Sequence, residues 1–146
     1  MSSIWISYKY REGGILPDGE KLPNIPVVNL SFIRKDLRSA LIATAFMDTG
    51  FDGSVYANDD MLNFLVDLKP EVKESLKGVE KEVECEVYEI ETNLITEDLR
   101  FIKRLGKVKV HVPIDPENLS DDIIIGREIL NSLTLKLNGK YTELLE

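Results

Sequence analysis

Residues 40–56, ALIATAFMDTGFDGSVY, carry the strongest structural signal in this chain. The stretch begins as an apolar run typical of a buried strand and changes abruptly to Asp48, Thr49 and Gly50. A second, shorter β-like segment ends at Tyr56. A carboxylate at the end of a buried strand is costly unless another group pairs with it or shares its proton. Asp48 is therefore either a turn residue bonded to its own backbone or a carboxylate with a chemical function.

The composition on either side of this stretch is that of a globular domain. The chain has 146 residues, of which 43% are hydrophobic and 30% charged, which suits one domain with its own core. The net charge of −8 argues against nucleic acid as a partner, because such binding depends on neutralised phosphates. No apolar run reaches about 18 residues and no secretory signal pattern is present, so we expect no membrane span. The single cysteine, Cys85, cannot form an internal disulfide, which favours the cytoplasm.

Hydrophobic periodicity predicts a mostly β chain that closes as a barrel or a sandwich. One helix is predicted over residues 57–69, capped by Asn58 or Asp59, and a second over residues 69–78. A bulge is expected near Ile90, where strict alternation breaks. Strands 27–33 and 40–47 are predicted to form a hairpin. The other predicted strands are 4–10, 53–56, 81–91, 105–114, 123–125 and 133–139.

The surroundings of Asp48 resemble the active-site loop of the retropepsin-like aspartic proteases. In that loop an apolar strand is followed by Asp-Thr-Gly, then by two or three residues, and then by Ser or Thr and an apolar pair. Residues 45–56 of this chain, AFMDTGFDGSVY, follow the same order. The family's second motif has two hydrophobic residues, Gly and often Arg before a short helix; this chain has DDIIIGREIL at 121–130. The resemblance extends over residues 26–138 and identifies the chain as a single-domain, retroviral-type member of clan AA, of the prokaryotic or archaeal kind.

The resemblance implies a mostly β fold, a closed acid-protease barrel with one or two short helices, formed by residues 26–146. Residues 1–25 fall outside the resemblance as a strand and loop extension. The implied activity is that of an aspartic endopeptidase, which hydrolyses peptide bonds with an activated water and needs no cofactor or metal. The implied catalytic residues are Asp48, Thr49 and Gly50, and the implied substrate-binding or loop-supporting residues are Phe51, Asp52, Ser54, Gly126 and Arg127, with Asp52 paired to Arg127.

One Asp-Thr-Gly per chain makes the implied function depend on a second copy. Two neighbouring carboxylates can divide the roles of acid and base, because both cannot stay ionised at short range. We therefore expect a twofold homodimer in which Asp48 faces Asp48 of the partner subunit and Thr49 bonds across to the partner loop. Gly126 would pack behind the loop, where only a small residue fits. Strands 4–10 and 133–139 are candidates for the intersubunit sheet.

Some features depart from the family pattern. Phe51 stands where Ala, Ser or Thr is usual and cannot donate a hydrogen bond to the carboxylate, so an active enzyme is expected to work nearer neutral pH. The flap over the site is expected at 76–84 or, alternatively, at 91–103. These departures leave open a catalytically weak or silent dimeric interaction module, and a plain β domain, which a stable monomer would favour. His111 and Cys85 are expected to be structural, and no metal-ligand spacing is present.

Overall fold

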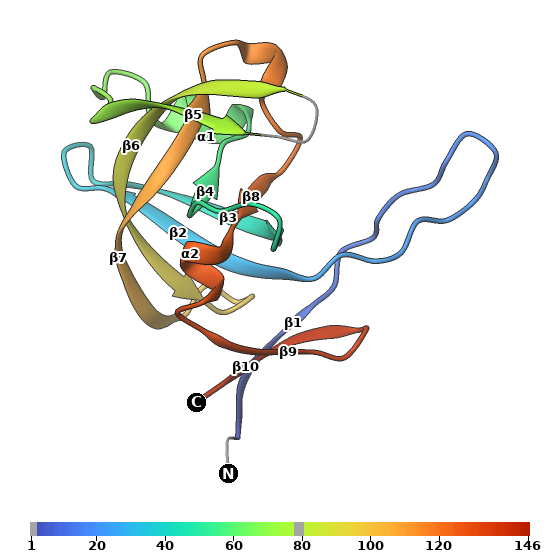
Figure 1. The fold of residues 1–146 in the computed structure, drawn as a ribbon. Helices are drawn as coiled ribbons and strands as arrows, with labels where there is room; N and C mark the ends of the chain where they lie inside the picture. The colour runs from blue at the N-terminus through green and yellow to red at the C-terminus, as the bar shows by residue number, and fades with distance from the viewer. Residues whose placement is uncertain (1–2, 78–80) are drawn as a thin grey trace.

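Strands dominate the protein, with short helical segments between them (Figure 1). The computed structural model describes residues 3–77 and 81–146. In that part of the chain the helical segments are α1 (Asp59–Phe64), the 3-10 turn η1 (Pro116–Asn118) and α2 (Arg127–Leu130), and no helix could serve as a membrane span. The strands are β1 (Ile4–Lys9), β2 (Val27–Arg34), β3 (Ser39–Met47), β4 (Val55–Tyr56), β5 (Val72–Lys77), β6 (Glu82–Ile95), β7 (Phe101–Pro113), β8 (Ile123–Ile125), β9 (Thr134–Leu137) and β10 (Tyr141–Leu145).

Six strands close into a barrel, which confirms the prediction of a mostly β, barrel-forming chain. The order around the barrel is β2-β3-β8-β4-β7-β6, and the pairing of β2 with β6 closes the ring. Strands β2 and β3 form the predicted antiparallel hairpin, whereas β3 with β8, and β4 with β7, are parallel pairs. Apolar side chains from all around the barrel fill its interior and exclude water from it. The most buried of them include Leu30, Phe32, Val55, Val110 and Ile125.

The predicted second helix, over residues 69–78, is wrong. Val72–Lys77 form β5, which pairs antiparallel with an edge of β6 outside the ring. Lys73 lies opposite Glu86, and Lys77 lies opposite Glu82. Opposite charges therefore face each other across the strand pair. The helix signals, a proline near the start and a glycine after the end, are local, and pairing with the available edge of β6 outweighs them. The glycine, Gly78, lies outside the described residues.

Helix α1 begins as predicted and ends earlier than the predicted limit of residues 57–69. Asn58, rather than Asp59, caps the helix, because its side-chain oxygen accepts a hydrogen bond from the backbone N–H of Met61 at 3.0 Å. Met61 is fully buried, so the apolar face of the helix packs on the barrel as its periodicity predicts.

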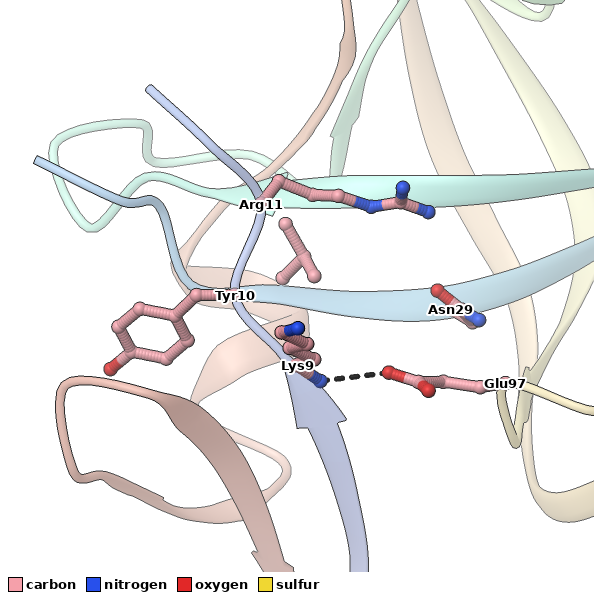
Figure 2. A pocket seen from close by; sticks show the side chains of 6 residues that line it. Lys9, Tyr10, Arg11, Asn29 and Glu97 are labelled. Carbon is pink, nitrogen blue, oxygen red and sulfur yellow. Dashed lines mark hydrogen bonds between the residues drawn. The ribbon is translucent and has the colours of Figure 1, made fainter. Parts of the chain in front are cut away.

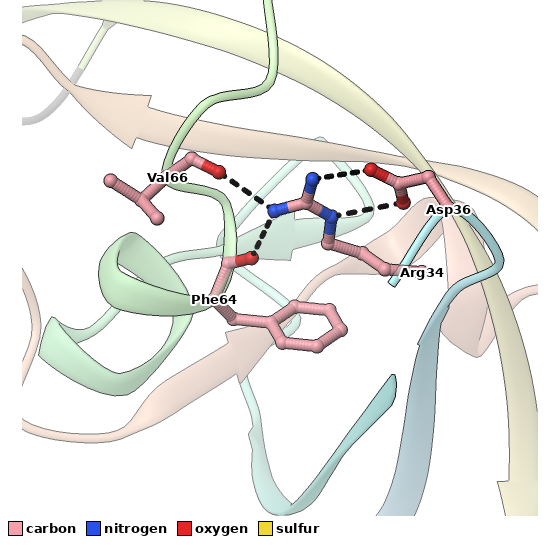
Figure 3. Close-up of polar contacts among 4 residues, drawn as sticks. All are labelled: Arg34, Asp36, Phe64 and Val66. Atoms are coloured by element: carbon pink, nitrogen blue, oxygen red, sulfur yellow. Dashed lines mark hydrogen bonds and ion pairs between the residues drawn. The ribbon is translucent and has the colours of Figure 1, made fainter. Parts of the chain in front are cut away.

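The end of α1 is held by Arg34, a buried residue at the end of β2 that the sequence patterns do not single out (Figure 3). Its guanidinium donates hydrogen bonds to the carbonyl oxygens of Phe64 and Val66, at 3.1 and 2.7 Å. On its other side it contacts the carboxylate of Asp36 at 2.6 Å. This hydrogen bond holds the pKa of Asp36 below its usual value. A charged side chain therefore satisfies carbonyls that the last turn leaves open.

The bulge expected near Ile90 lies further along β6. Pairing with β7 runs without interruption past Ile90, and the register first shifts between Thr92 and Asn93. The buried face of β6 nevertheless changes between Val87 and Ile90. The change coincides with a change of neighbour on the other edge, because the first half of β6 pairs with β5 and the second half with β2. Because no residue is inserted there, the side chains keep alternating, and what changes is which face of the strand is covered.

The two ends of the chain form a separate three-stranded sheet, β1-β10-β9. The strand predicted at 133–139 is β9 and the turn after it, and the unpredicted β10 returns antiparallel beside it. Strand β1 pairs with β10, so the two candidates for an intersubunit sheet, strands 4–10 and 133–139, are joined through β10 within one copy of the protein. Between β1 and β2, residues 11–25 run out from the body and back as a long arm (Figure 1).

Candidate active site

Asp48 lies in the loop that follows β3, and its side chain is exposed, as is that of Thr49. The backbone N–H of Asp48 donates to the carbonyl of Ile125 at 3.0 Å, which continues the pairing of β3 with β8. Its carboxylate accepts a hydrogen bond from the backbone N–H of Gly50 at 2.8 Å. The carboxylate thus stands at the surface of a single chain, oriented by backbone, and does not bear the cost of burial.

The loop after β3 is joined by backbone hydrogen bonds to the segment where β8 passes into α2. The N–H of Gly126 donates to the carbonyl of Ser54 at 2.9 Å, and the N–H of Arg127 donates to the carbonyl of Phe51 at 2.9 Å. These bonds bring together two motifs that are more than seventy positions apart in the chain. Every site residue named from the sequence lies in this loop or in the segment bonded to it.

Gly126 is buried at the point where the loop approaches most closely. A Cβ at this position would lie 2.3 Å from the carbonyl oxygen of Gly53 and 2.4 Å from that of Phe51. Atoms at such distances overlap, and the obstructing groups are backbone, so the loop would have to move. The packing of the loop on α2 therefore requires glycine at position 126.

Two side-chain contacts add to these backbone bonds. Arg127 forms an ion pair with Asp52, as the resemblance implies, and both side chains are exposed, so the pair adds little to stability. The hydroxyl of Ser54 donates to the carboxylate of Glu128 at 2.7 Å. Ser54 is buried and needs such an acceptor. Sequence reasoning missed Glu128, whose only signal is its place directly after Gly126 and Arg127.

Phe51 turns its ring into an aromatic cluster beneath the loop. The ring meets Tyr56 and His111 edge to face, with centroids 6.0 and 5.9 Å apart. His111 is buried, and its Nε2 lies 2.9 Å from a carboxylate oxygen of Glu74 in β5. The cluster therefore connects the Asp48 loop to β7 and, through Glu74, to β5. Nothing in the sequence pattern brings His111 and Glu74 together.

Burial around this cluster suppresses ionisation of two further groups. Burial raises the pKa of the Tyr56 hydroxyl to about 12, and this hydroxyl donates a hydrogen bond to the carbonyl of Asn118 at 2.5 Å. Burial, with a smaller contribution from the charge of Glu74, raises the pKa of the Cys85 thiol to about 11. Cys85 is thus a protonated core residue at neutral pH, which matches its expected structural role.

Asp48 borders a cleft of about 430 Å³ between its loop and the β5–β6 hairpin. The hairpin supplies Leu76, Lys77 and Val83, and the opposite wall includes Phe51. A smaller hollow of about 290 Å³ continues between the loop and β5. The larger cleft is lined by Asp48, Gly50, Phe51, Tyr56, Leu76, Lys77, Val83, Asn118, Ser120 and Ile124.

Of the two segments considered for the flap, the described part of 76–84 faces Asp48 across this cleft. Residues 78–80 of this segment lie outside the described residues. The ammonium of Lys81 donates to the side-chain oxygen of Asn118 at 2.6 Å, which fixes one side of the hairpin to the body. The other segment, 91–103, turns beside β1 and accepts a hydrogen bond there through Glu97 (Figure 2).

Among the described residues that line the cleft, Asp48 is the one carboxylate. Among residues 3–77 and 81–146, no group of three or more His, Cys, Asp and Glu side chains is arranged to hold a metal ion. An oriented, exposed carboxylate can accept a proton from water, and a second carboxylate brought beside it would retain a proton and act as the acid.

No protein-family model matches this chain, and no curated protein sequence matches it. Among solved structures, the chain is similar to the crystal structure of a retropepsin-like aspartic protease from Rickettsia conorii. The match covers 99% of this chain and 93% of that chain, with a TM-score of 0.58 and 13% sequence identity. At this identity the likeness is one of fold. The chain therefore has the fold of a retropepsin-like aspartic protease, in agreement with the motifs around Asp48 and Gly126.

Proposed function

We propose that this protein is an aspartic endopeptidase that acts as a homodimer, with residues 26–146 as the protease domain and 1–25 as an extension. The observation that carries the proposal is the position of Asp48, exposed on a cleft and oriented by the N–H of Gly50. The retropepsin-like fold supports it, because in this chain the Asp-Thr-Gly motif of that resemblance directly follows strand β3 of the fold. We expect the enzyme to work in the cytoplasm.

In the proposed mechanism, Asp48 and Asp48 of the partner subunit share one proton across the twofold axis. The ionised carboxylate takes a proton from water as the water oxygen bonds to the carbonyl carbon of the peptide. The protonated carboxyl gives its proton to the carbonyl oxygen, which produces a tetrahedral intermediate. The intermediate, a gem-diol, collapses when the C–N bond breaks. The nitrogen takes up a proton from the aspartic acid that had accepted one from water, and the other aspartate takes a proton from a hydroxyl of the gem-diol, which becomes the product carboxyl group and returns the shared proton to the pair. No cofactor and no covalent bond to the enzyme are needed.

The proposed substrate is an extended peptide lying between the Asp48 loop and the β5–β6 hairpin. Phe51, Leu76 and Val83 give the cleft apolar walls that suit apolar side chains. An extended peptide can also hydrogen-bond through its backbone to neighbouring strands, as peptides do when they add to a sheet.

The decisive experiment compares the wild-type protein with the Asp48→Asn variant on a peptide library. We expect cleavage to fall by about a thousandfold or more, because the variant cannot form the acid–base pair. The dimer should persist, which sedimentation equilibrium would show. The Asp59→Asn variant, altered at an exposed acid of α1, is the matched control and should cleave normally. Equal cleavage by wild type and Asp48→Asn would rule out the proposed enzyme.

One observation favours a second candidate, a dimeric interaction module without activity. Phe51 directs an apolar ring toward Tyr56 and His111, where a serine or threonine could have donated to Asp48. A module would bind extended peptides in the same cleft without cleaving them. Intact peptide bound equally by wild type and Asp48→Asn would identify this case.

A further inference from the structure

Residues 11–25 form an arm that projects from the barrel as an irregular antiparallel hairpin (Figure 1). Arg11 and Ile25 exchange two backbone hydrogen bonds at its root, at 3.0 and 2.8 Å. Further out, Ile15 pairs with Lys21, and the N–H of Leu22 donates to the carbonyl of Gly14 at 2.9 Å. Since an extended chain rises about 3.3 Å per residue, the arm reaches on the order of 20 Å from its root.

The arm exposes apolar side chains that its own chain does not cover. Ile15 is 73% exposed, Leu22 is 38% exposed and Leu16 is 37% exposed. Apolar side chains gathered on one projecting element are a common mark of a protein contact. The arm also carries near-balanced charge, whereas the chain as a whole has a net charge of −8. With two basic and three acidic residues, the arm adds little to the repulsion between two copies of such an acidic protein.

The root of the arm lies beside the Asp48 loop. The carbonyl of Pro26, directly after the arm, accepts a hydrogen bond at 3.3 Å from the N–H of Met47, directly before Asp48. The guanidinium of Arg11 donates to the hydroxyl of Thr44 in β3 at 3.0 Å. Figure 2 shows the side chain of Arg11 lying along the strands at this root. The arm therefore begins next to the loop that a second copy would meet in the proposed dimer.

A groove at the same root could receive an apolar partner. It encloses about 510 Å³ between the arm and the outer face of β3, where Ile42 is 46% exposed. Its lining includes the apolar Leu41 and Phe46 and the acids Asp60 and Asp122. In a contact with an arm, Lys21 would lie at these acids, and the arm's own acids would lie away from them. In a twofold dimer both copies present the same surface. The arm of each copy can therefore enter the groove of the other copy.

We infer that the arm clasps a second copy of this chain, with its apolar side chains in the groove beside β3 of the partner. This inference rests on the proposed function, because that function places a second copy against the Asp48 loop. The arm then holds the two copies together from a position next to the paired aspartates, in addition to any contact made by the terminal strands. In this arrangement each arm contacts the outer face of the partner subunit, and the cleft beside Asp48 stays open to the substrate.

The test measures the dimer dissociation constant by sedimentation equilibrium, together with peptide cleavage, for the full-length protein. Ile15→Ser/Leu22→Ser removes the apolar contact, and Ile42→Ser alters the groove. The matched control, Leu37→Ser/Val66→Ser, changes two other exposed apolar residues, away from the arm. A further variant replaces residues 12–24 with Asn-Gly, a two-residue turn that suits the hydrogen-bonded pair of Arg11 and Ile25. Circular dichroism verifies that each variant is folded.

We expect the arm and groove variants to raise the dissociation constant by about tenfold or more, and the control to leave it unchanged. If folded arm variants dimerise like the wild type while cleavage still depends on Asp48, the arm inference is overturned and the proposed function stands. A wild-type protein that stays monomeric at all concentrations and cleaves nothing overturns both. An arm variant that is monomeric at low concentration and regains cleavage when concentrated supports both.

Discussion

Phe51 illustrates how one residue can serve packing and restrict chemistry. Its ring stacks edge-on against Tyr56 and His111 and so fixes the loop that carries Asp48. Phenylalanine at this position also has no hydroxyl that could donate a hydrogen bond to the carboxylate of Asp48. Packing and chemistry at this position are therefore in competition.

The first prediction concerns the chemistry at Phe51. In the Phe51→Thr variant, a hydroxyl beside Asp48 favours the charged carboxylate, so we expect the pH optimum of cleavage to fall by about one unit. Loss of the ring contacts should also lower stability, by about 2–4 kcal/mol. Rate profiles against pH and urea unfolding curves measure the two effects. Phe51→Leu, which keeps an apolar residue, is the control and should leave the optimum unchanged.

The second prediction follows from the Cys85 thiol, whose pKa burial raises from 9.0 to about 11. An unfolded thiol ionises near pH 9, whereas the folded one keeps its proton, so the folded state binds more protons between these values. Stability is then full below pH 9 and falls as the pH rises toward 11. Urea unfolding measured from pH 8 to 11 should show this decline, and Cys85→Ala should reduce its slope. An unchanged slope in that variant would contradict the assignment.

At the scale of elements, the site depends on the joint between the Asp48 loop and the start of α2. Neither element is stable in this conformation alone, since the loop is irregular and α2 has a single turn. Backbone hydrogen bonds and a close glycine contact hold the two in place. Strand β8, which lies beside β3, sets their relative position.

The third prediction tests this joint with Gly126→Ala. The added methyl group would overlap the carbonyls of Gly53 and Phe51, so the loop must shift. We expect a loss of about 1–3 kcal/mol in the free energy of unfolding and a larger proportional loss of cleavage, because small displacements disturb the aspartate pair. Asn131→Ala, at the exposed end of the same helix, is the control. Full activity of Gly126→Ala would show that the joint tolerates movement.

The fourth prediction concerns α1, a short helix that ends against a charged residue of β2. Replacing Arg34 with Met leaves the carbonyls of Phe64 and Val66 without their donor, so we expect a lower urea midpoint. Hydrogen exchange should rise first in the segment that follows α1, since that is where the contact is lost. The control is Lys35→Met, at the exposed neighbouring position. An unaltered midpoint for Arg34→Met would show that water replaces the guanidinium.

At the scale of the whole molecule, one chain supplies one Asp48 and half of the proposed active site. The barrel places this residue at the surface, next to the root of an uncovered arm, instead of enclosing it. Association is then part of catalysis and not only of stability, so activity should depend on protein concentration.

The fifth prediction uses mixtures of wild type and Asp48→Asn. If each site needs Asp48 from both chains, equal mixing with free exchange leaves roughly a quarter of the dimers fully wild type. Cleavage should then fall to about that fraction of the activity of the same total concentration of wild type. If each chain acts alone, half of the activity remains. The mixture thus distinguishes a shared site from an independent one in a single titration.

Much of the molecule follows from local sequence. Local sequence patterns predict the strand at 40–47, the helix cap at Asn58 and the motif around Gly126. Each of these patterns depends on neighbouring residues alone, and each agrees with the fold. The site residues from Asp48 to Ser54 could be named because their types and spacing recur in a known family. By contrast, Glu74, His111 and Glu128 carry no local signal, since each acquires its role from a partner far away in the chain.

Local patterning thus accounts for a strand-rich barrel with an Asp-Thr-Gly loop, because periodicity and motif spacing are properties of short segments. Long-range pairing accounts for the rest. Residues 72–77 are a strand because they pair with an edge of β6, and the hairpin they form faces Asp48 because β6 is shared with the barrel. The arm of residues 11–25 is fixed at its root, where Arg11 and Ile25 bond each other and Arg11 also bonds Thr44 of β3, an arrangement that no periodicity within the arm encodes.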